Sequence, residues 1–224
     1  MTSFPLSILL DLDGTLIDSQ PGILASCNAA ILALGHEPDP SLDLAAVIGP
    51  PMDEVMRHIL TRYEDDRVTE AVSAYREHYG TIGLFGSTVY PEIPEAMDRL
   101  IALGAKLYVA TSKRTVFAHR ILDHLGLTGR LTGVFGSEAG GALDEKTELI
   151  AHMLKHEGIT PARCIMVGDR RYDVLGAHAN NMHAIGVLWG YGSQGELEAA
   201  GADELIRLPT DLPSTAIRME TQGK

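Results

Sequence analysis

Two aspartates placed directly after an apolar run restrict what this chain can be more than any other pattern in it. Residues 6–10 are apolar apart from Ser7, which is typical of a buried strand. Asp11 and Asp13 follow, and their spacing puts both carboxylates on one side of an extended backbone. Gly14 then permits a sharp turn. The same sequence is also compatible with a strand that ends in an ordinary Asp-Gly turn. Paired carboxylates, however, suit a bound cation with nucleophilic and acid–base chemistry.

Strand and helix patterns alternate from residue 86 onward. The periodicity predicts strands over 106–111, 164–168 and 183–188, and helices over 146–157 and from about 173. Such alternation is typical of a parallel sheet with helices on both faces. Ligands of open parallel sheets bind beyond the carboxyl ends of the strands, where the aspartate pair falls.

Residues 18–83 have a different pattern, because three apolar stripes occur there at helical spacing without a strand. The stripes run from Ile23 to Leu34, from Met52 to Leu60 and from Val68 to Tyr79. We therefore predict that a helical domain over 18–83 is inserted into an α/β core formed by 1–17 and 84–224.

Three further polar motifs complete the pattern. Thr111 and Ser112 end one predicted strand, Lys146 opens a helix, and Asp169 and Asp173 follow another strand. The four motifs in this order resemble the haloacid dehalogenase superfamily of phosphotransferases over residues 6 to about 206. Each motif is weak alone, but three of the four stand at strand ends and the set is specific. The resemblance implies a doubly wound α/β core with an inserted all-α cap domain.

The resemblance also implies phosphoryl transfer through Asp11. A carboxylate that attacks phosphorus forms an aspartyl-phosphate and divides one hard hydrolysis into two easier steps. Asp13 would protonate the leaving oxygen and later take a proton from water, a role worth about 10²–10⁴-fold in rate. Dehalogenase members of the superfamily lack the second aspartate, so Asp13 favours phosphoryl transfer over dehalogenation.

A carboxylate that faces a phosphate dianion needs a cation, and hard oxygen ligands suit Mg²⁺. By resemblance, Asp11, the backbone carbonyl of Asp13 and Asp169 hold the ion. Asp173 either ligates it or orients its water. The plainer interpretation of Asp169 and Asp173 is a Gly-Asp turn with an acidic residue at a helix N-terminus.

The phosphoryl group itself would be bound by the second and third motifs. The resemblance assigns the Thr111 hydroxyl and the Ser112 backbone amide to its oxygens. Lys146 would place a charge against both Asp11 and the phosphoryl group. A lone lysine at a helix start is ordinarily solvated, and here the order of the motifs favours the catalytic interpretation. Many relatives have proline after this lysine, where this chain has Thr147.

Three residues are candidate substrate contacts. Gly49 begins a Gly-Pro-Pro segment where relatives place a substrate-contacting loop, and Arg57 lies a helical turn beyond it. Arg170 lies inside the fourth motif, where many relatives carry smaller residues. A surface ion pair is an equally good interpretation of Arg170.

Composition limits the partners. The net charge of −12 disfavours nonspecific binding to nucleic acid or an anionic membrane. The sequence has neither an apolar run as long as a membrane span nor a secretory signal pattern. Cys27 and Cys164 lie in unrelated segments, so we expect reduced structural cysteines in a cytoplasmic protein. We expect a small phosphorylated metabolite as partner, and a monomer or homodimer.

The helical cap and the Gly190–Ser193 segment look like the phosphoglycolate phosphatase-like group. That group hydrolyses phosphoglycolate, 5′-nucleotides and other small phosphomonoesters. We therefore predict a Mg²⁺-dependent phosphatase. Two alternatives stay open: a phosphomutase like β-phosphoglucomutase, which shares the four motifs, and a non-catalytic protein that binds a phosphate ligand. The sequence leaves the substrate undefined.

Overall fold

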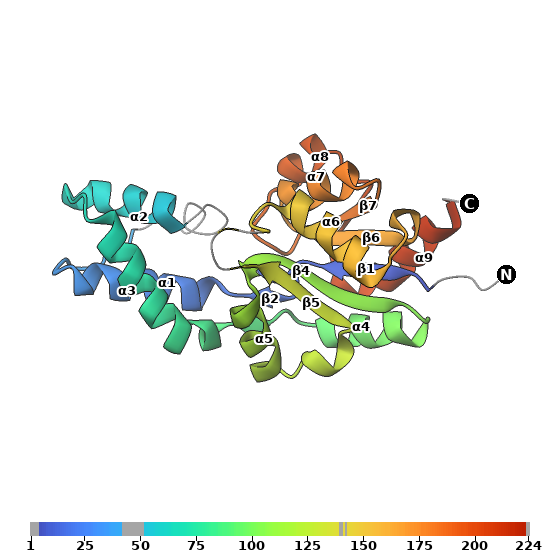
Figure 1. Ribbon diagram of the computed structural model, residues 1–224, viewed down its shortest axis with the longest axis horizontal. Coiled ribbons are helices and arrows are strands. Elements are labelled where there is room, and N and C mark those ends of the chain that lie inside the picture. The colour runs from blue at the N-terminus through green and yellow to red at the C-terminus, as the bar shows by residue number, and fades with distance from the viewer. Residues whose placement is uncertain (1–4, 42–51, 139–140, 142, 223–224) are drawn as a thin grey trace. The chain divides into compact units, whose positions relative to one another are not determined.

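The computed structural model describes residues 5–41, 52–138, 141 and 143–222 (Figure 1). Residue contacts divide the chain into two compact units. The core unit comprises Met1–Asp18 and Val89–Lys224, and the helical unit comprises Ser19–Thr88. The corresponding boundaries predicted from the sequence fall after residues 17 and 83.

A six-stranded sheet forms the centre of the core unit. Its strands are β1 (Ser7–Leu10), β4 (Lys106–Arg114), β5 (Gly133–Ser137), β6 (Cys164–Gly168), β7 (His183–Val187) and β8 (Glu204–Ile206). They lie in the order β5-β4-β1-β6-β7-β8, and each neighbouring pair is parallel. The chain proceeds outward from β1 to β5 and then crosses to β6 on the other side. This confirms the predicted doubly wound sheet and places its switch point at β1.

Helices cover both faces of this sheet. They are α4 (Ile93–Ala102), α5 (Thr115–His124), α6 (Lys146–Glu157), α7 (Arg171–Ala179), α8 (Gln194–Ala199) and α9 (Leu212–Gln222). Figure 1 shows α6, α7 and α8 on one side of the sheet and α4 and α5 on the other. An apolar cluster that includes Leu9, Ile150 and Met166 fills the layer between the sheet and α6 and α7. Strands buried on both faces explain the continuous apolar runs in the sequence.

Short elements complete the described chain. The 3-10 helices are η2 (Thr61–Tyr63), η3 (Gly83–Gly86), η4 (Thr128–Arg130), η5 (Pro161–Arg163) and η6 (Pro209–Asp211). The strands β2 (Ile17–Asp18) and β3 (Thr88–Val89) form a separate two-stranded sheet. Within the described residues, no helix is both long enough and apolar enough to span a membrane.

Local sequence signals explain where α6 begins and ends. Its buried face carries the predicted stripe of Leu149, Ile150, Met153 and Leu154. Gly158 follows the helix with a φ of +65°, a left-handed conformation that glycine adopts without strain and that commonly ends helices. The helix therefore holds Lys146 in its first turn and presents one apolar side to the sheet.

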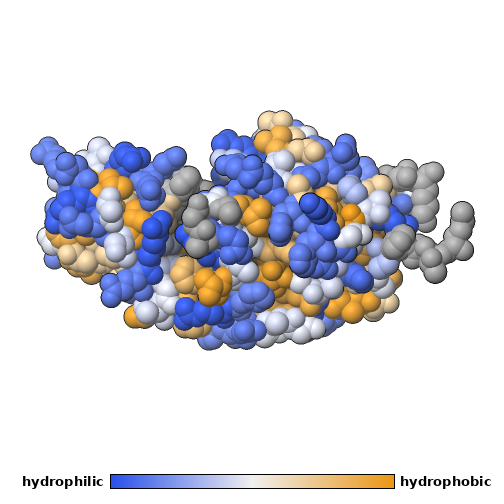
Figure 2. Space-filling model, viewed as in Figure 1, coloured by the Kyte–Doolittle hydropathy of each residue, from blue (hydrophilic) through white to orange (hydrophobic). Residues whose placement is uncertain are grey.

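The helical unit contains α1 (Gln20–Ala33), α2 (Met52–Leu60) and α3 (Val68–Thr81). Helix α1 packs on α3 and on η3, and α2 packs on α3. A Cβ atom on Gly22 would lie 2.0 Å from the Gly83 carbonyl oxygen, so glycine is what allows α1 to approach η3 this closely. The predicted apolar stripes contribute buried residues to all three helices, such as Ile23, Val55 and Val72. The surface of both units, coloured by hydropathy, is shown in Figure 2.

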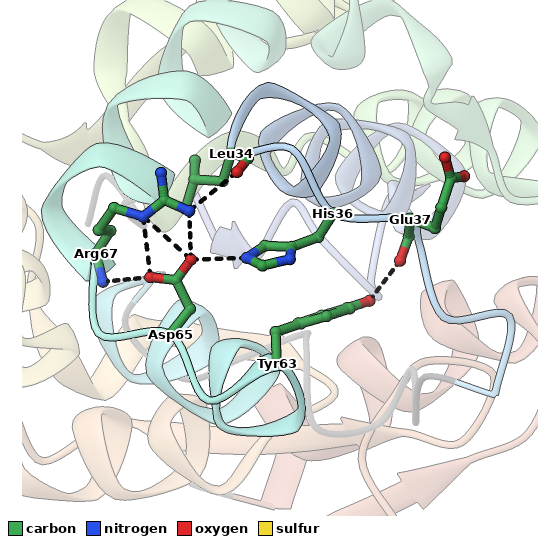
Figure 3. A network of polar contacts seen from close by, with 6 residues as sticks. All are labelled: Leu34, His36, Glu37, Tyr63, Asp65 and Arg67. Atoms are coloured by element: carbon green, nitrogen blue, oxygen red, sulfur yellow. Dashed lines mark hydrogen bonds and ion pairs between the residues drawn. The ribbon is translucent and has the colours of Figure 1, made fainter.

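A polar network holds the connection between η2 and α3 against the end of α1 (Figure 3). The Asp65 carboxylate, 8% exposed, accepts hydrogen bonds from Arg67 Nε at 3.1 Å and pairs with His36 Nε2 at 2.7 Å. Arg67 also donates to the Leu34 carbonyl oxygen at 2.9 Å, and the Tyr63 ring stacks on His36. The hydrogen bonds from Arg67 and His36 hold the pKa of Asp65 well below its ordinary value.

The two cysteines are buried and free. Burial raises the pKa of Cys27 to about 12 and also raises that of Cys164, so neither thiol is readily ionised. Cys27 packs inside the helical unit and Cys164 begins β6, where both act as small apolar side chains.

Candidate active site

The parallel register brings the polar motifs to one edge of the sheet in the core unit. Leu10, the last residue of β1, is paired with Val109 of β4 and with Val167 of β6. The next backbone group, the Asp11 N–H, donates to the Val167 carbonyl oxygen at 2.9 Å. β1 and β6 therefore end nearly level beside the middle of β4, and Asp169 emerges beside Asp11.

Three acidic side chains meet at this edge. Asp11, Asp169 and Asp173 each offer an oxygen atom, and these atoms lie within 4.8 Å of one another. Asp11 follows β1, Asp169 follows β6, and Asp173 lies in the first turn of α7. All three are buried, with exposures of 8%, 0% and 2%.

Lys146 reaches this cluster from the start of α6. Its Nζ donates to Asp11 Oδ1 at 2.8 Å and to the Ala110 carbonyl oxygen at 2.9 Å. The same ammonium lies 2.8 Å from Asp173 Oδ1, although that oxygen receives no directed hydrogen bond. Lys146 is only 6% exposed, so it is not the solvated lysine that is ordinary at the start of a helix.

One ammonium does not compensate three buried carboxylates. Burial raises the pKa of Asp11 to about 7, although Lys146 opposes the shift. Burial, followed by repulsion from Asp11 and Asp173, raises the pKa of Asp169 to about 8. Burial alone would lower the pKa of Lys146, but Asp11 and Asp173 raise it above its ordinary value. The cluster therefore carries uncompensated negative charge when it is fully ionised.

The donor atoms fit a hard divalent cation. The three side chains offer carboxylate oxygens, without the histidine or cysteine that softer metals prefer. Asp173 Oδ1 is shielded from solvent, and the Lys146 ammonium 2.8 Å from it is shared with Asp11. Three buried carboxylates around one ammonium are costly, and a divalent cation at this cluster would offset their remaining charge.

Two glycines allow the acidic residues to approach each other. Gly14 has a φ of +82°, and a Cβ atom there would lie 2.3 Å from Asp169 Oδ2. A Cβ atom on Gly168 would lie 2.2 Å from the Asp173 carboxylate. Any larger residue at either position would displace a carboxylate of the cluster.

Asp13 has a cationic partner that the sequence interpretation did not single out. Lys113 Nζ lies 3.0 Å from Asp13 Oδ2. Asp13 Oδ1 is shielded from solvent and has no hydrogen-bond partner among the described residues. The sequence signal that could have identified Lys113 is its spacing: it follows Thr111 by two positions near the end of an extended strand, where residues two apart share one face.

The two predicted phosphate-binding residues on β4 differ in exposure. Thr111 is buried, and its Oγ1 accepts a hydrogen bond from the backbone N–H of Lys113 at 3.2 Å. Because the oxygen serves as acceptor, the hydroxyl proton of Thr111 is available for another group. Ser112 is exposed.

A segment after β7 also supports the site. The backbone N–H of Tyr191 donates to Asp169 Oδ2 at 2.8 Å, and Thr15 Oγ1 lies 3.4 Å from Asp169 Oδ1. The Trp189 indole donates to the Thr15 carbonyl oxygen at 3.0 Å, and the Tyr191 hydroxyl donates to Asp18 at 2.9 Å. The sequence interpretation used this segment only as a group signature, whereas the structure shows that it fixes Asp169.

Arg170, one of the three candidate substrate contacts, adjoins the acidic cluster, because its backbone N–H donates to Asp173 Oδ2 at 3.1 Å. Arg170 Nε donates to Glu196 Oε1 at 3.0 Å, the ion pair that the plainer interpretation expected. Arg57 is exposed on α2 in the helical unit, and Gly49 lies outside the described residues. Their roles toward a substrate stay predictions.

Comparison with known proteins identifies the family. The model of the family described as haloacid dehalogenase-like hydrolase matches residues 8–187. A 5′-nucleotidase from Pseudomonas aeruginosa is 40% identical over 86% of this chain and 87% of its own length. A phosphoglycolate phosphatase from Neisseria meningitidis is 31% identical over 83% of this chain and 81% of its own length.

A solved structure gives the same result for the fold. Protein tyrosine kinase A from Mycobacterium tuberculosis superimposes with a TM-score of 0.79 at 32% identity, covering 95% of this chain and 98% of that one. The chain therefore belongs to the haloacid dehalogenase-like hydrolases, as the order of its motifs indicated. It is a hydrolase of that family, with a buried acidic cluster suited to a metal ion.

Proposed function

We propose that this protein is a Mg²⁺-dependent phosphatase that hydrolyses a small phosphomonoester through an aspartyl-phosphate on Asp11. The main support is the position of Asp11: a buried carboxylate at the end of the central strand, held at 2.8 Å by Lys146. The similarity to a 5′-nucleotidase and to a phosphoglycolate phosphatase supports a substrate of one of those two kinds.

In the first step, an Asp11 oxygen attacks phosphorus and the ester oxygen leaves with a proton from Asp13. In the second step, Asp13 takes a proton from water, which attacks the phosphorus and regenerates Asp11. Lys146 restrains Asp11 and offers positive charge to the phosphoryl oxygens, toward which the Thr111 hydroxyl and the Ser112 amide donate.

Asp11, Asp169 and the backbone carbonyl of Asp13 would hold the magnesium ion, with Asp173 as a ligand or as a partner of its water. When bound, this ion neutralises the repulsion between the phosphate and the nucleophilic carboxylate. The uncompensated charge of the acidic cluster and its all-oxygen donor set support this assignment.

The two compact units would have different roles in the reaction. We assign catalysis to the core unit, which carries all four motifs, and substrate selection to the helical unit as a cap domain. The helical unit contributes Arg57, a cation suited to an anionic substrate.

The test is phosphate release from p-nitrophenyl phosphate by the full chain. We expect activity that is lost on chelation, returns with Mg²⁺ and is poorly supported by Ca²⁺, which is larger and less strict in geometry. Asp11→Asn should abolish it, whereas Asp211→Asn, an exposed aspartate of the core unit, should not. A panel of phosphoglycolate, 5′-nucleotides, sugar phosphates and pyrophosphate then defines the substrate. Absence of Mg²⁺-dependent turnover on every phosphomonoester would favour the binding protein.

A phosphomutase is the second candidate, because the same intermediate can pass its phosphoryl group to an alcohol. The similarity to a protein named as a tyrosine kinase supports considering an acceptor other than water. Phosphate release from sugar phosphates, measured with and without a bisphosphate activator, separates the two. A phosphatase releases phosphate without the activator, whereas a mutase isomerises the sugar phosphate and depends on it.

A further inference from the structure

The ion pair between Lys113 and Asp13 has no part in the two steps of the proposed reaction. Lys113 Nζ lies 3.0 Å from Asp13 Oδ2, and the two side chains are 10% and 21% exposed. A long lysine side chain loses much of its rotamer freedom when it is held in one place. Exposed pairs rarely justify that cost, but this pair is largely removed from water, where the attraction is less screened.

The two oxygens of the Asp13 carboxylate have different surroundings. Oδ2 faces the Lys113 ammonium, whereas Oδ1 is shielded from solvent and has no hydrogen-bond partner in the described structure. A shielded oxygen without a partner is costly unless another molecule supplies one. An ammonium on one oxygen also restricts rotation of the carboxylate, so the other oxygen keeps a fixed direction.

We infer that Lys113 is a positioning residue for Asp13, an inference that rests on the proposed function. Its ammonium holds Oδ2 and so fixes the orientation of the carboxylate that exchanges protons with the leaving group and with water. In the first step, the bond between Asp11 and phosphorus forms and the ester P–O bond breaks. The proton on the Asp13 carboxyl group passes to the departing oxygen, which keeps the electron pair of the broken bond. Lys113 retains its proton throughout.

Leaving groups of different basicity separate this role from direct binding of the phosphoryl group. An alkoxide leaves slowly unless it is protonated, whereas p-nitrophenolate is a stable anion and hardly needs the proton. A lysine that acts through Asp13 therefore matters for alkyl phosphates and little for p-nitrophenyl phosphate. A lysine that contacts the phosphoryl group matters equally for both.

The experiment compares Lys113→Met with wild type on the best alkyl phosphomonoester and on p-nitrophenyl phosphate. We measure kcat/KM, because it reports only the steps up to release of the leaving group. The variant should lose about 10–100-fold on the alkyl ester, the scale of a misplaced catalytic group, and change little on p-nitrophenyl phosphate. Lys113→Arg should restore part of the lost activity. Lys106→Met, the same change at the exposed start of β4, is the matched control and should change neither rate.

A second arm repeats Lys113→Met in an Asp13→Asn background. If Lys113 acts through Asp13, the second change should cause no further loss on the alkyl ester. The crystal structure of Lys113→Met should show the Asp13 carboxylate in a new orientation. If Lys113→Met does not fold, Lys113→Gln is compared in the same way.

Three results would overturn the inference: an equal loss on both esters, a full further loss in the Asp13→Asn background, or no loss on the alkyl ester. Failure of the proposed function looks different, because wild type itself would then release no phosphate from either ester. In that case the role assigned to Lys113 falls with it.

Discussion

Individual side chains at this site are defined by their burial more than by their type. Asp11 and Asp65 are both aspartates next to cations, but the pKa of Asp11 is raised to about 7 and that of Asp65 is lowered. Desolvation outweighs the opposing effect of Lys146 at Asp11, whereas hydrogen bonds from Arg67 dominate at Asp65. The site thus holds anions that need a cation, and the helical unit holds an anion that already has one.

The acidic cluster makes stability depend on pH and on metal. The pKa values of Asp11 and Asp169 are about 7 and 8 in the folded chain and about 4 in an unfolded one. Between those values the folded state binds more protons, so the free energy of unfolding of the metal-free protein should fall as pH rises from about 4 to about 8. Mg²⁺ binding releases these protons, so the stabilisation by Mg²⁺ should grow over the upper part of that range.

Urea unfolding with Mg²⁺ or with a chelator, from about pH 5.5 to about pH 8.5, measures this dependence. We expect a small gain from Mg²⁺ at low pH and a large gain at high pH. Asp169→Asn should reduce both the gain and its slope. A gain from Mg²⁺ that did not change with pH would show that these carboxylates do not bind the ion.

Gly14→Ala tests how tightly the acidic residues are packed. Its φ of +82° costs an alanine about 1–2 kcal/mol, and the new Cβ would also displace Asp169. Gly104 is a matched control, because its φ is +86° and a Cβ added there would meet no neighbouring group within 4 Å. Both variants should lose similar stability by urea unfolding, but only Gly14→Ala should lose Mg²⁺ affinity by calorimetry. Unchanged Mg²⁺ affinity in Gly14→Ala would contradict this geometry.

Among the secondary-structure elements, the end of η2 and the start of α3 depend on one carboxylate. The lowered pKa of Asp65 means that its contribution to stability is complete above about pH 4, the unfolded value, and is lost as pH falls through the folded value. Asp65→Asn should therefore lower the thermal midpoint at neutral pH, and the difference from wild type should shrink below about pH 4. Asp66→Asn, an exposed neighbour, should show neither effect. A difference that stayed constant down to about pH 2 would contradict the pairing in Figure 3.

The elements that the sequence predicted are those whose hydrophobic periodicity extends over enough residues to be recognised. Strand 164–168 and helix 146–157 have the predicted bounds, because continuous burial and a four-residue stripe define them. β2, β3 and β8 span only two or three residues and show no period. β4 continues to Arg114, beyond the predicted end at residue 111, through a shift in its pairing with β5. Helix α7 begins at Arg171, earlier than the predicted 173, because the Asp173 side chain accepts a hydrogen bond from the Arg170 backbone N–H. Such hydrogen bonds leave no periodic signal.

The site was predictable to the extent that the order of motifs carries it. Asp11, Lys146, Asp169 and Asp173 were named from their places at strand ends and a helix start, and the structure brings them together. Lys113 was not singled out, since its spacing of two positions from Thr111 near the end of a strand is a weak signal. Its contact with Asp13 joins positions that are far apart in the sequence. The anchoring of Asp169 by the segment after β7 was missed for the same reason, because backbone hydrogen bonds do not depend on residue type.

Considered as a whole, the molecule concentrates its chemistry at the switch point of the sheet while its net charge is −12. The overall field repels an anionic substrate, so binding depends on local cations such as Lys146 and on a metal ion at the acidic cluster. Every step proposed for the reaction depends on Asp11 becoming covalently bound to phosphorus.

A crystal structure of the protein with Mg²⁺ and beryllofluoride tests that dependence most directly, because beryllofluoride on a carboxylate stands in for an acyl phosphate. We predict an adduct on an Asp11 oxygen, with the metal ion bound by Asp11 and Asp169. An adduct on another side chain, or a metal ion bound away from this cluster with Asp11 unmodified, would contradict the mechanism.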